Sequence, residues 1–117
     1  MSKYVKKLPN EPSFQQQGLT GYNFDLECKD ISLSFEDVFK GHDKYDKNFY
    51  SSKIYYVLEG NGIFCIENEK MEVKQGDVVE VPKGANFVFA GKMKLLLIMS
   101  PAFRPQDDIH GEDNDLY

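Results

Sequence analysis

The side chains best placed for binding or acid–base chemistry lie in a strand-like stretch that begins at Lys53. Side chains alternate between the two faces of a β-strand, so Lys53, Tyr55 and Val57 share one face. A buried ammonium must find an anion, reach solvent or lose its charge, and the expected partner of Lys53 is Glu80, just before Pro82. Lys53, Tyr55 and Glu80 are therefore the candidate groups for moving protons.

The residues around this stretch are typical of short antiparallel strands joined by tight turns. Apolar runs rich in Val, Ile, Tyr and Phe are interrupted at short intervals by Gly, Asn-Gly or Pro. No window of helical length has an apolar stripe at helical spacing, which favours an all-β sandwich or small barrel. The sequence predicts a polar loop over 41–48 and strands over 24–28, 31–39, 52–58, 63–67, 71–74, 78–81, 86–89 and 94–99.

Both ends of the chain are expected to be irregular. Residues 1–23 hold prolines and glycines around a glutamine run, which predicts an arm with at most one short edge strand near residues 4–8. The acidic segment from Gln106 onward is typical of a frayed, solvated terminus. We therefore predict a single domain over residues 1–117, with a barrel over about 24–100 and a tail over 101–117.

Length, composition and charge narrow the classes of partner. A chain of 117 residues with 41% hydrophobic residues can bury one core and one ligand-sized pocket. The net charge is -5, and no basic stripe is present, so a nucleic-acid partner is not expected. Neither a signal peptide nor a membrane-spanning run is found, which favours a cytoplasmic protein without membrane contact. Cys28 and Cys65 lack CxxC spacing and are expected to be buried free thiols.

The spacing of glycines and one proline resembles the two motifs of the cupin family. Gly41 and Gly60 lie where the first motif begins and ends, and Gly76, Pro82, Gly84 and Gly91 follow the second. The resemblance covers roughly residues 31–100 and is to small single-domain cupins with an RmlC-like jelly-roll. It implies a double-stranded β-helix barrel and, because cupins commonly pair through their sheets, a homodimer.

The residues at the family's metal-ligand positions cannot supply metal ligands. Lysine and phenylalanine replace the usual histidines and glutamate at all four positions, Lys47, Phe49, Lys53 and Phe87. A protonated lysine has no free lone pair, and a phenyl ring offers no donor atom. We therefore predict no metal and no other cofactor. His42 and His110 lie outside the motif, so neither is expected to act as a base.

The resemblance implies an aromatic cavity that contains one cation. Its expected ligand-binding residues are Lys47 at the mouth, Phe49, Lys53, Tyr55, Phe87 and Phe89. Such a cavity suits a partly apolar small molecule with an anionic or electron-rich group. In the alternative interpretation, the aromatic side chains simply fill the core. Asp107 and Asp108 could curl over the mouth, although a frayed tail is favoured.

Three functions are compatible with these residues. The favoured one is a metal-independent cupin that binds a small metabolite, such as a sugar derivative or anionic small molecule. The second is a metal-independent isomerase, epimerase or lyase acting on a sugar or keto acid, with Lys53, Tyr55 or Glu80 as acid or base. The third is a dimeric structural or regulatory module that binds no ligand.

Overall fold

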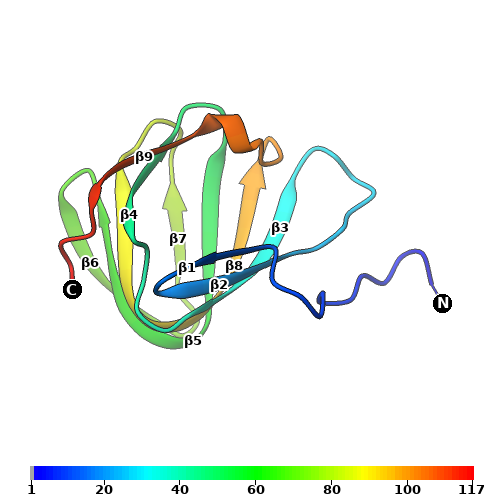
Figure 1. Cartoon of the computed structure of the whole chain (residues 1–117), viewed down its shortest axis with the longest axis horizontal. Coiled ribbons are helices and arrows are strands. Elements are labelled where there is room, and N and C mark those ends of the chain that lie inside the picture. Colours follow the sequence, from blue (N-terminus) through cyan, green and yellow to red (C-terminus); the bar gives the residue numbers. More distant parts are fainter. Residues whose placement is uncertain (1) are drawn as a thin grey trace.

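The computed structural model describes residues 2–117, whose regular structure is almost entirely β-strand (Figure 1). No helix in this range has the length and apolar character needed to cross a bilayer. The elements in chain order are β1 (Phe14–Gln16), β2 (Leu19–Asn23), β3 (Ser32–Val38), β4 (Lys44–Asn48), β5 (Ser52–Ile66), β6 (Glu69–Lys74), β7 (Val78–Val81), β8 (Phe87–Ser100), the short 3₁₀-helix η1 (Pro105–Asp107) and β9 (Asp108–Asp113).

Two long strands, β5 and β8, connect the two halves of one curled sheet. They pair antiparallel from Ser52 opposite Ser100 to Ile66 opposite Phe87. In one half, β7 pairs with the first part of β5, and β3 pairs with the last part of β8. In the other half, β6 pairs with the last part of β5, while β4 adjoins the start of β8. Figure 1 shows the sheet curling around its interior, which confirms the predicted all-β jelly-roll architecture.

Glycines let β5 and β8 bend between the two halves without ending. Gly60 has φ +84°, and a Cβ there would lie 2.1 Å from a backbone carbonyl oxygen of β8. Gly91 has φ +138°, and its Cβ would lie 2.6 Å from the Cα of Gly62 on the paired strand. Only glycine tolerates both conditions. The strands predicted over 52–58 and 63–67 are therefore one continuous strand, β5. Those predicted over 86–89 and 94–99 are likewise one continuous strand, β8.

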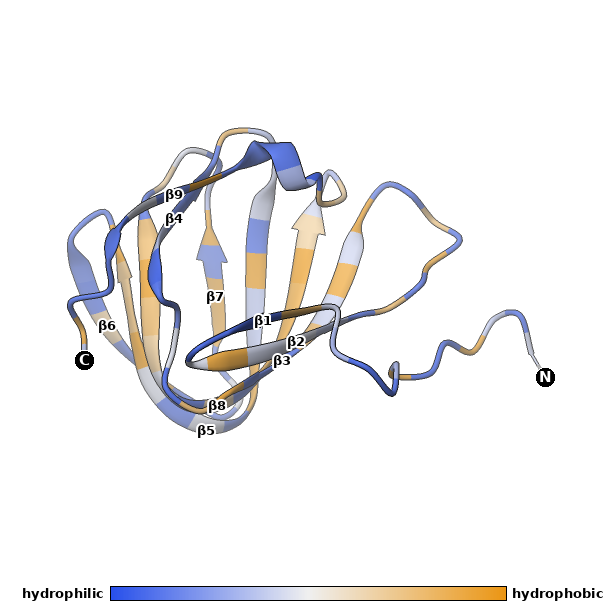
Figure 2. Cartoon of the chain, in the orientation of Figure 1, coloured by the Kyte–Doolittle hydropathy of each residue, from blue (hydrophilic) through white to orange (hydrophobic). Residues whose placement is uncertain are grey.

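The core lies between the two halves and is rich in aromatic side chains. Tyr55, Phe64, Phe87 and Phe89 are almost fully buried. The ring centre of Phe89 lies 4.9 Å from that of Phe64 and 5.5 Å from that of Tyr55. Figure 2 shows the hydrophobic segments concentrated on the strands of the curled sheet. Burying each such side chain contributes roughly 1.5–3 kcal/mol, so this cluster anchors the barrel.

The N-terminal region differs from the prediction. Residues 2–13 contain no strand, so the expected edge strand near residues 4–8 is wrong; residue 1 lies outside the described residues. Instead β1 and β2 form a hairpin, and β2 pairs with β3 from Leu19 opposite Val38. Residues 24–28 are likewise not a strand, because β2 already occupies the edge of β3. Cys65 is buried as predicted, whereas Cys28 is exposed.

The expected loop over 41–48 and the expected frayed tail form a pair of strands. β4 pairs with β9, with Asn48 opposite Asp108 and Lys47 opposite Ile109. Charged side chains join them further along, where Lys44 Nζ lies 2.7 Å from an oxygen of Asp113. The apolar alternation that marks most strands is missing from both segments, which is why the sequence did not reveal them.

Candidate functional site

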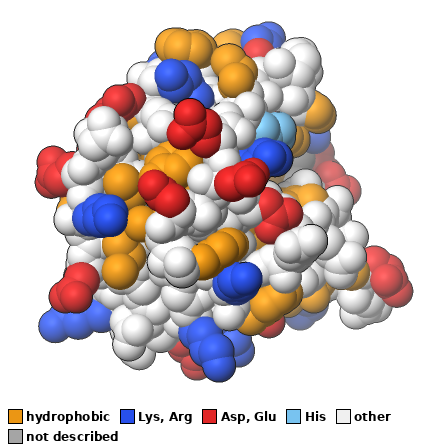
Figure 3. Space-filling model, turned by 60° about the vertical axis from the view of Figure 1, so that its left-hand side comes forward, with side chains coloured by type: hydrophobic (Ala, Val, Ile, Leu, Met, Phe, Trp, Pro, Cys, Tyr) orange, Lys and Arg blue, Asp and Glu red, His pale blue; other side chains and the backbone are white. Residues whose placement is uncertain are grey.

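A pocket of about 660 Å³ opens beside the aromatic core, between the β1–β3 side of the sheet and the β4–β9 edge. This volume is within the range of small-molecule sites. Figure 3 shows a histidine on the surface, with basic and acidic side chains close to it. The titratable residues among those lining the pocket are Glu36, His42, Asp43, Lys44, Asp46, Lys53, Tyr55, Asp108 and His110.

Lys53 is buried in the pocket with a carboxylate partner from β9. Its Nζ lies 3.2 Å from Asp108 Oδ1, and Asn48 Nδ2 donates to the same oxygen over 2.8 Å. The expected ion pair with Glu80 is wrong. Glu80 stands opposite Ile54 in the β5–β7 pairing, so its exposed side chain points to the other face of the sheet. The cation is therefore neutralised by the segment that was expected to be a frayed tail.

His42 is a pocket residue that the sequence patterns did not reveal. Its ring is stacked on Phe89 with 3.9 Å between ring centres, and 3% of the residue is exposed. Burial, and secondarily the charge of Lys53, lowers the pKa of His42 to about 3, so its imidazole is neutral at pH 7. His110 also lines the pocket, so both histidines contribute to it although both lie outside the cupin motif.

Two buried carboxyl groups accompany His42. Burial raises the pKa of Glu36 to about 7, against the opposing effect of Lys53, and burial also raises the pKa of Asp46. Tyr55 is buried, and its pKa is raised well above the ordinary value by burial and then by Glu36. Near neutral pH the pocket thus holds a neutral imidazole, and burial favours the protonated form of the Glu36 carboxyl group in the same pocket.

Two polar atoms of the pocket lack partners within the described residues. Glu36 Oε1 and His42 Nδ1 are buried and make no hydrogen bond to residues 2–117. Leaving a buried polar atom unpaired costs on the order of 1–3 kcal/mol. Stable proteins retain such groups mainly where a ligand or a reaction uses them. The pocket is therefore suited to a small molecule that offers hydrogen-bonding groups.

The structure brings together only part of the predicted site. Lys53 and Tyr55 line the pocket, whereas Phe87 and Phe89 belong to the aromatic core against which the pocket rests. Phe49 is 65% exposed and points away from the cavity. Lys47 is half-buried, and its Nζ lies 5.8 Å from the ring centre of Phe49. Neither is among the residues that line the pocket.

The inward side chains of β4 follow from simple alternation. Asp46 and Asn48 are buried while Lys47 and Phe49 between and after them are not. His42 lies four residues before Asp46, and residues an even number apart share a face of an extended segment. Treating residues 42–48 as a strand would have placed His42, Asp46 and Asn48 together. The tail residues Asp108 and His110 carry no comparable signal.

The residues present do not fit a metal ion of the kind that many cupins hold. Within residues 2–117, no group of three or more His, Cys, Asp or Glu side chains is arranged to hold one. At the family's ligand positions, Lys53 is paired with Asp108 and Phe87 is part of the core.

Comparisons with known proteins agree with the fold. The family model "Cupin domain" matches residues 47–99. A Streptomyces protein, Pac13, described as a nucleoside dehydratase and solved with uridine, superposes with a TM-score of 0.88 at 27% identity, covering 97% of this chain and 93% of that one. KdgF from Halomonas sp. shares the fold, with a TM-score of 0.70 at 16% identity over 85% of this chain and 94% of KdgF.

Relatives in sequence match shorter stretches. An uncharacterised protein of Methanocaldococcus jannaschii is 50% identical over 36 residues, which are 31% of this chain and 29% of that protein. The chain spans less than half the length of the curated relatives it matches. The matched segment and the jelly-roll architecture together identify this chain as a small cupin domain.

Proposed function

We propose that this cupin domain binds a nucleoside-like molecule in the pocket at His42 and eliminates water from it without a metal ion. The observation that carries the proposal is the neutral, buried imidazole of His42 in one cavity with the carboxyl group of Glu36, whose pKa is about 7. The substrate class is supported by the likeness to the Streptomyces nucleoside dehydratase along almost the whole chain.

The substitutions studied in that protein support the same pocket. Variants solved with uridine replace a histidine by glutamine and a tyrosine by phenylalanine at positions whose numbers fall on His42 and Tyr55 here. Another tyrosine replaced there has the number of Phe89, on which His42 stacks in this chain. We infer that His42 and Tyr55 contact the ligand.

Elimination of water requires a base for a proton and an acid for the departing hydroxyl group. His42 accepts a proton from a carbon next to a carbonyl group, the electron pair of that C–H bond forms a double bond, and the hydroxyl on the neighbouring carbon departs. Glu36 supplies the proton that completes the leaving water. The proton taken up by His42 then replaces the one that Glu36 has lost. Lys53 and Tyr55 stabilise the negative charge that develops on the carbonyl oxygen.

The charges of the pocket favour an uncharged ligand over the anionic one expected from Lys53 alone. Lys53 is already paired with Asp108, and Asp46 adds a second buried carboxylate. Inside a partly buried site, these carboxylates repel a phosphate strongly. We therefore propose a nucleoside rather than a nucleotide.

Calorimetric titration with uridine and with uridine monophosphate tests the substrate class. We expect uridine to bind at least about tenfold more tightly than the monophosphate, a difference of about 1.4 kcal/mol. Equal or tighter binding of the monophosphate would reject the uncharged class. Absence of any uridine binding would reject a nucleoside site.

Mass spectrometry of uridine derivatives that carry a carbonyl group on the sugar tests the reaction. The expected result is loss of one water per turnover, with the rate reduced about 100-fold or more in His42→Gln, the range typical of a lost general base. Glu80→Gln is the matched control, since Glu80 is exposed on the opposite face and should leave the rate unchanged. Binding without water loss would instead support a binding module.

A further inference from the structure

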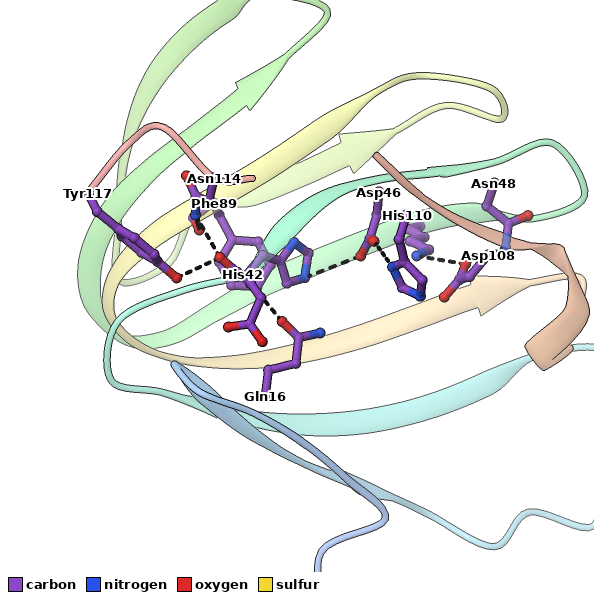
Figure 4. A network of polar contacts seen from close by, with 11 residues as sticks. Gln16, His42, Asp46, Asn48, Phe89, Asp108, His110, Asn114 and Tyr117 are labelled. Atoms are coloured by element: carbon purple, nitrogen blue, oxygen red, sulfur yellow. Dashed lines mark hydrogen bonds and ion pairs between the residues drawn. The ribbon is translucent and has the colours of Figure 1, made fainter. Parts of the chain in front are cut away.

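Asp46 lies between the two histidines of the chain. Its Oδ1 is 2.7 Å from His110 Nδ1, and its Oδ2 is 3.8 Å from His42 Nε2 (Figure 4). The side chains of His42 and Asp46 are 4% and 7% exposed, whereas that of His110 is 58% exposed. One buried carboxylate thus faces a largely exposed histidine on one side and a buried histidine on the other.

The surroundings of His42 favour one of its two neutral tautomers. A proton on Nε2 points toward the carboxylate of Asp46, whereas a proton on Nδ1 would be buried without an acceptor among residues 2–117. The backbone at His42 is held in place, because its carbonyl oxygen accepts hydrogen bonds from Asn114 Nδ2 at 2.8 Å and from the Tyr117 hydroxyl at 2.6 Å. The ring stacks on Phe89.

We propose that Asp46 is the positioning residue of His42, fixing its proton on Nε2 and transmitting to it the charge state of His110. This rests on the proposed function only in giving His42 the role of base. When His110 is protonated, its Nδ1–H offsets the charge of Asp46, and Asp46 then stabilises a positive charge on His42 less.

Three other charged groups also interact electrostatically with Asp46. They come from three strands packed around it: Glu36 on β3, Lys53 on β5 and Asp108 on β9. Lys53 and Asp108 form a pair with each other, so their effects on Asp46 partly cancel. Glu36 can change its own charge near pH 7, which makes Glu36→Gln the background in which the effect of His110 is measured most cleanly.

Nuclear magnetic resonance of the imidazole nitrogens tests the proposal without any ligand. Because the chain has two histidines, His42→Gln assigns both sets of signals. In the Glu36→Gln background we expect His42 to show widely separated nitrogen resonances, as one neutral tautomer gives, and a second shift as His110 titrates. In Asp46→Asn the two nitrogen resonances should move toward each other, and the His110-dependent shift should vanish.

His110→Gln is a second variant, which changes an exposed side chain. The glutamine amide can still donate a hydrogen bond to Asp46. It should keep the Nε2–H tautomer of His42 and lose the His110-dependent shift. Persistence of either the tautomer or that shift in a folded Asp46→Asn variant would overturn the proposal, as would persistence of the shift in His110→Gln. Failure of uridine to bind would bear on the proposed function and leave these spectra unaffected.

Discussion

Two residues of the pocket, His42 and Glu36, have pKa values that differ from those of the unfolded chain. The folded-state pKa of His42 is about 3 against an ordinary 6.5, and that of Glu36 is about 7 against 4.5. Both shifts arise mainly from burial, which disfavours the charged form. Their contributions to stability therefore have opposite dependence on pH.

For His42, the unfolded chain binds a proton between pH 6.5 and about 3 that the folded chain does not bind. Stability is thus retained above pH 6.5 and lost as the pH falls through this window. We predict that Glu36→Gln, in which this effect stands alone, loses roughly 2 kcal/mol of unfolding free energy between pH 6.5 and 4.5. Urea unfolding at both pH values measures it. A variant whose stability rises on acidification would contradict the buried, neutral state of His42.

For Glu36, the folded chain keeps a proton between pH 4.5 and about 7 that the unfolded chain has released. Stability therefore falls as the pH rises through this window. We predict that His42→Gln becomes less stable by roughly 2 kcal/mol between pH 4.5 and 6.5. The double variant should change little because both effects are absent, and the wild type should change little because they cancel. A flat profile for His42→Gln would mean that Glu36 is ionised in the folded state.

At the scale of elements, β9 completes the site from the opposite end of the chain. It covers the edge of β4, and its Asp108 neutralises Lys53. The strand buries little apolar surface, since its side chains are mostly exposed. Its attachment therefore depends on polar pairs, and removing one partner of a pair that contains a buried cation is the most destabilising change.

We predict that Asp108→Ala destabilises the fold by about 2–4 kcal/mol, because it leaves the Lys53 ammonium buried without its carboxylate. The double variant Lys53→Met with Asp108→Leu should recover most of this loss, since it removes the cation as well. Thermal or urea unfolding measures both. An Asp108→Ala variant as stable as the wild type would show that β9 does not pair with Lys53 in solution.

The sequence predicts the elements far better than it predicts the site. Glycine, proline and alternating apolar residues are local signals, and they located β3, β6 and β7 as well as the bodies of β5 and β8. The site residues lie on several separated segments, and Glu36, Asp46 and His42 are polar side chains turned inward. Hydrophobic patterning assigns such residues to loops or solvent. Their burial becomes visible only when the sheet is assembled.

At the scale of the whole molecule, the outer face of the sheet carries an apolar row. Strand pairing aligns Phe35, Leu96, Tyr56 and Val78 across β3, β8, β5 and β7. Tyr56 is 40% and Val78 62% exposed. The homodimer expected from the cupin resemblance remains a proposal, and this face is its most suitable contact surface.

We predict that Val78→Lys shifts the chain from dimer to monomer, because it would place a charge in the centre of a desolvated contact. Sedimentation velocity at micromolar concentration measures the change, and Glu72→Lys on the exposed side of β6 is the charge control. A wild-type chain that sediments as a monomer would reject the dimer.

The central proposal is nucleoside binding through His42 and Glu36, in the pocket between the β1–β3 side of the sheet and the β4–β9 edge. A crystal structure of the chain soaked with uridine tests it most directly. We expect the sugar to lie within hydrogen-bonding distance of Glu36 and His42, with Tyr55 and the Lys53–Asp108 pair close by. Uridine bound only outside this cavity, or a cavity closed by shifted core side chains, would contradict the claim.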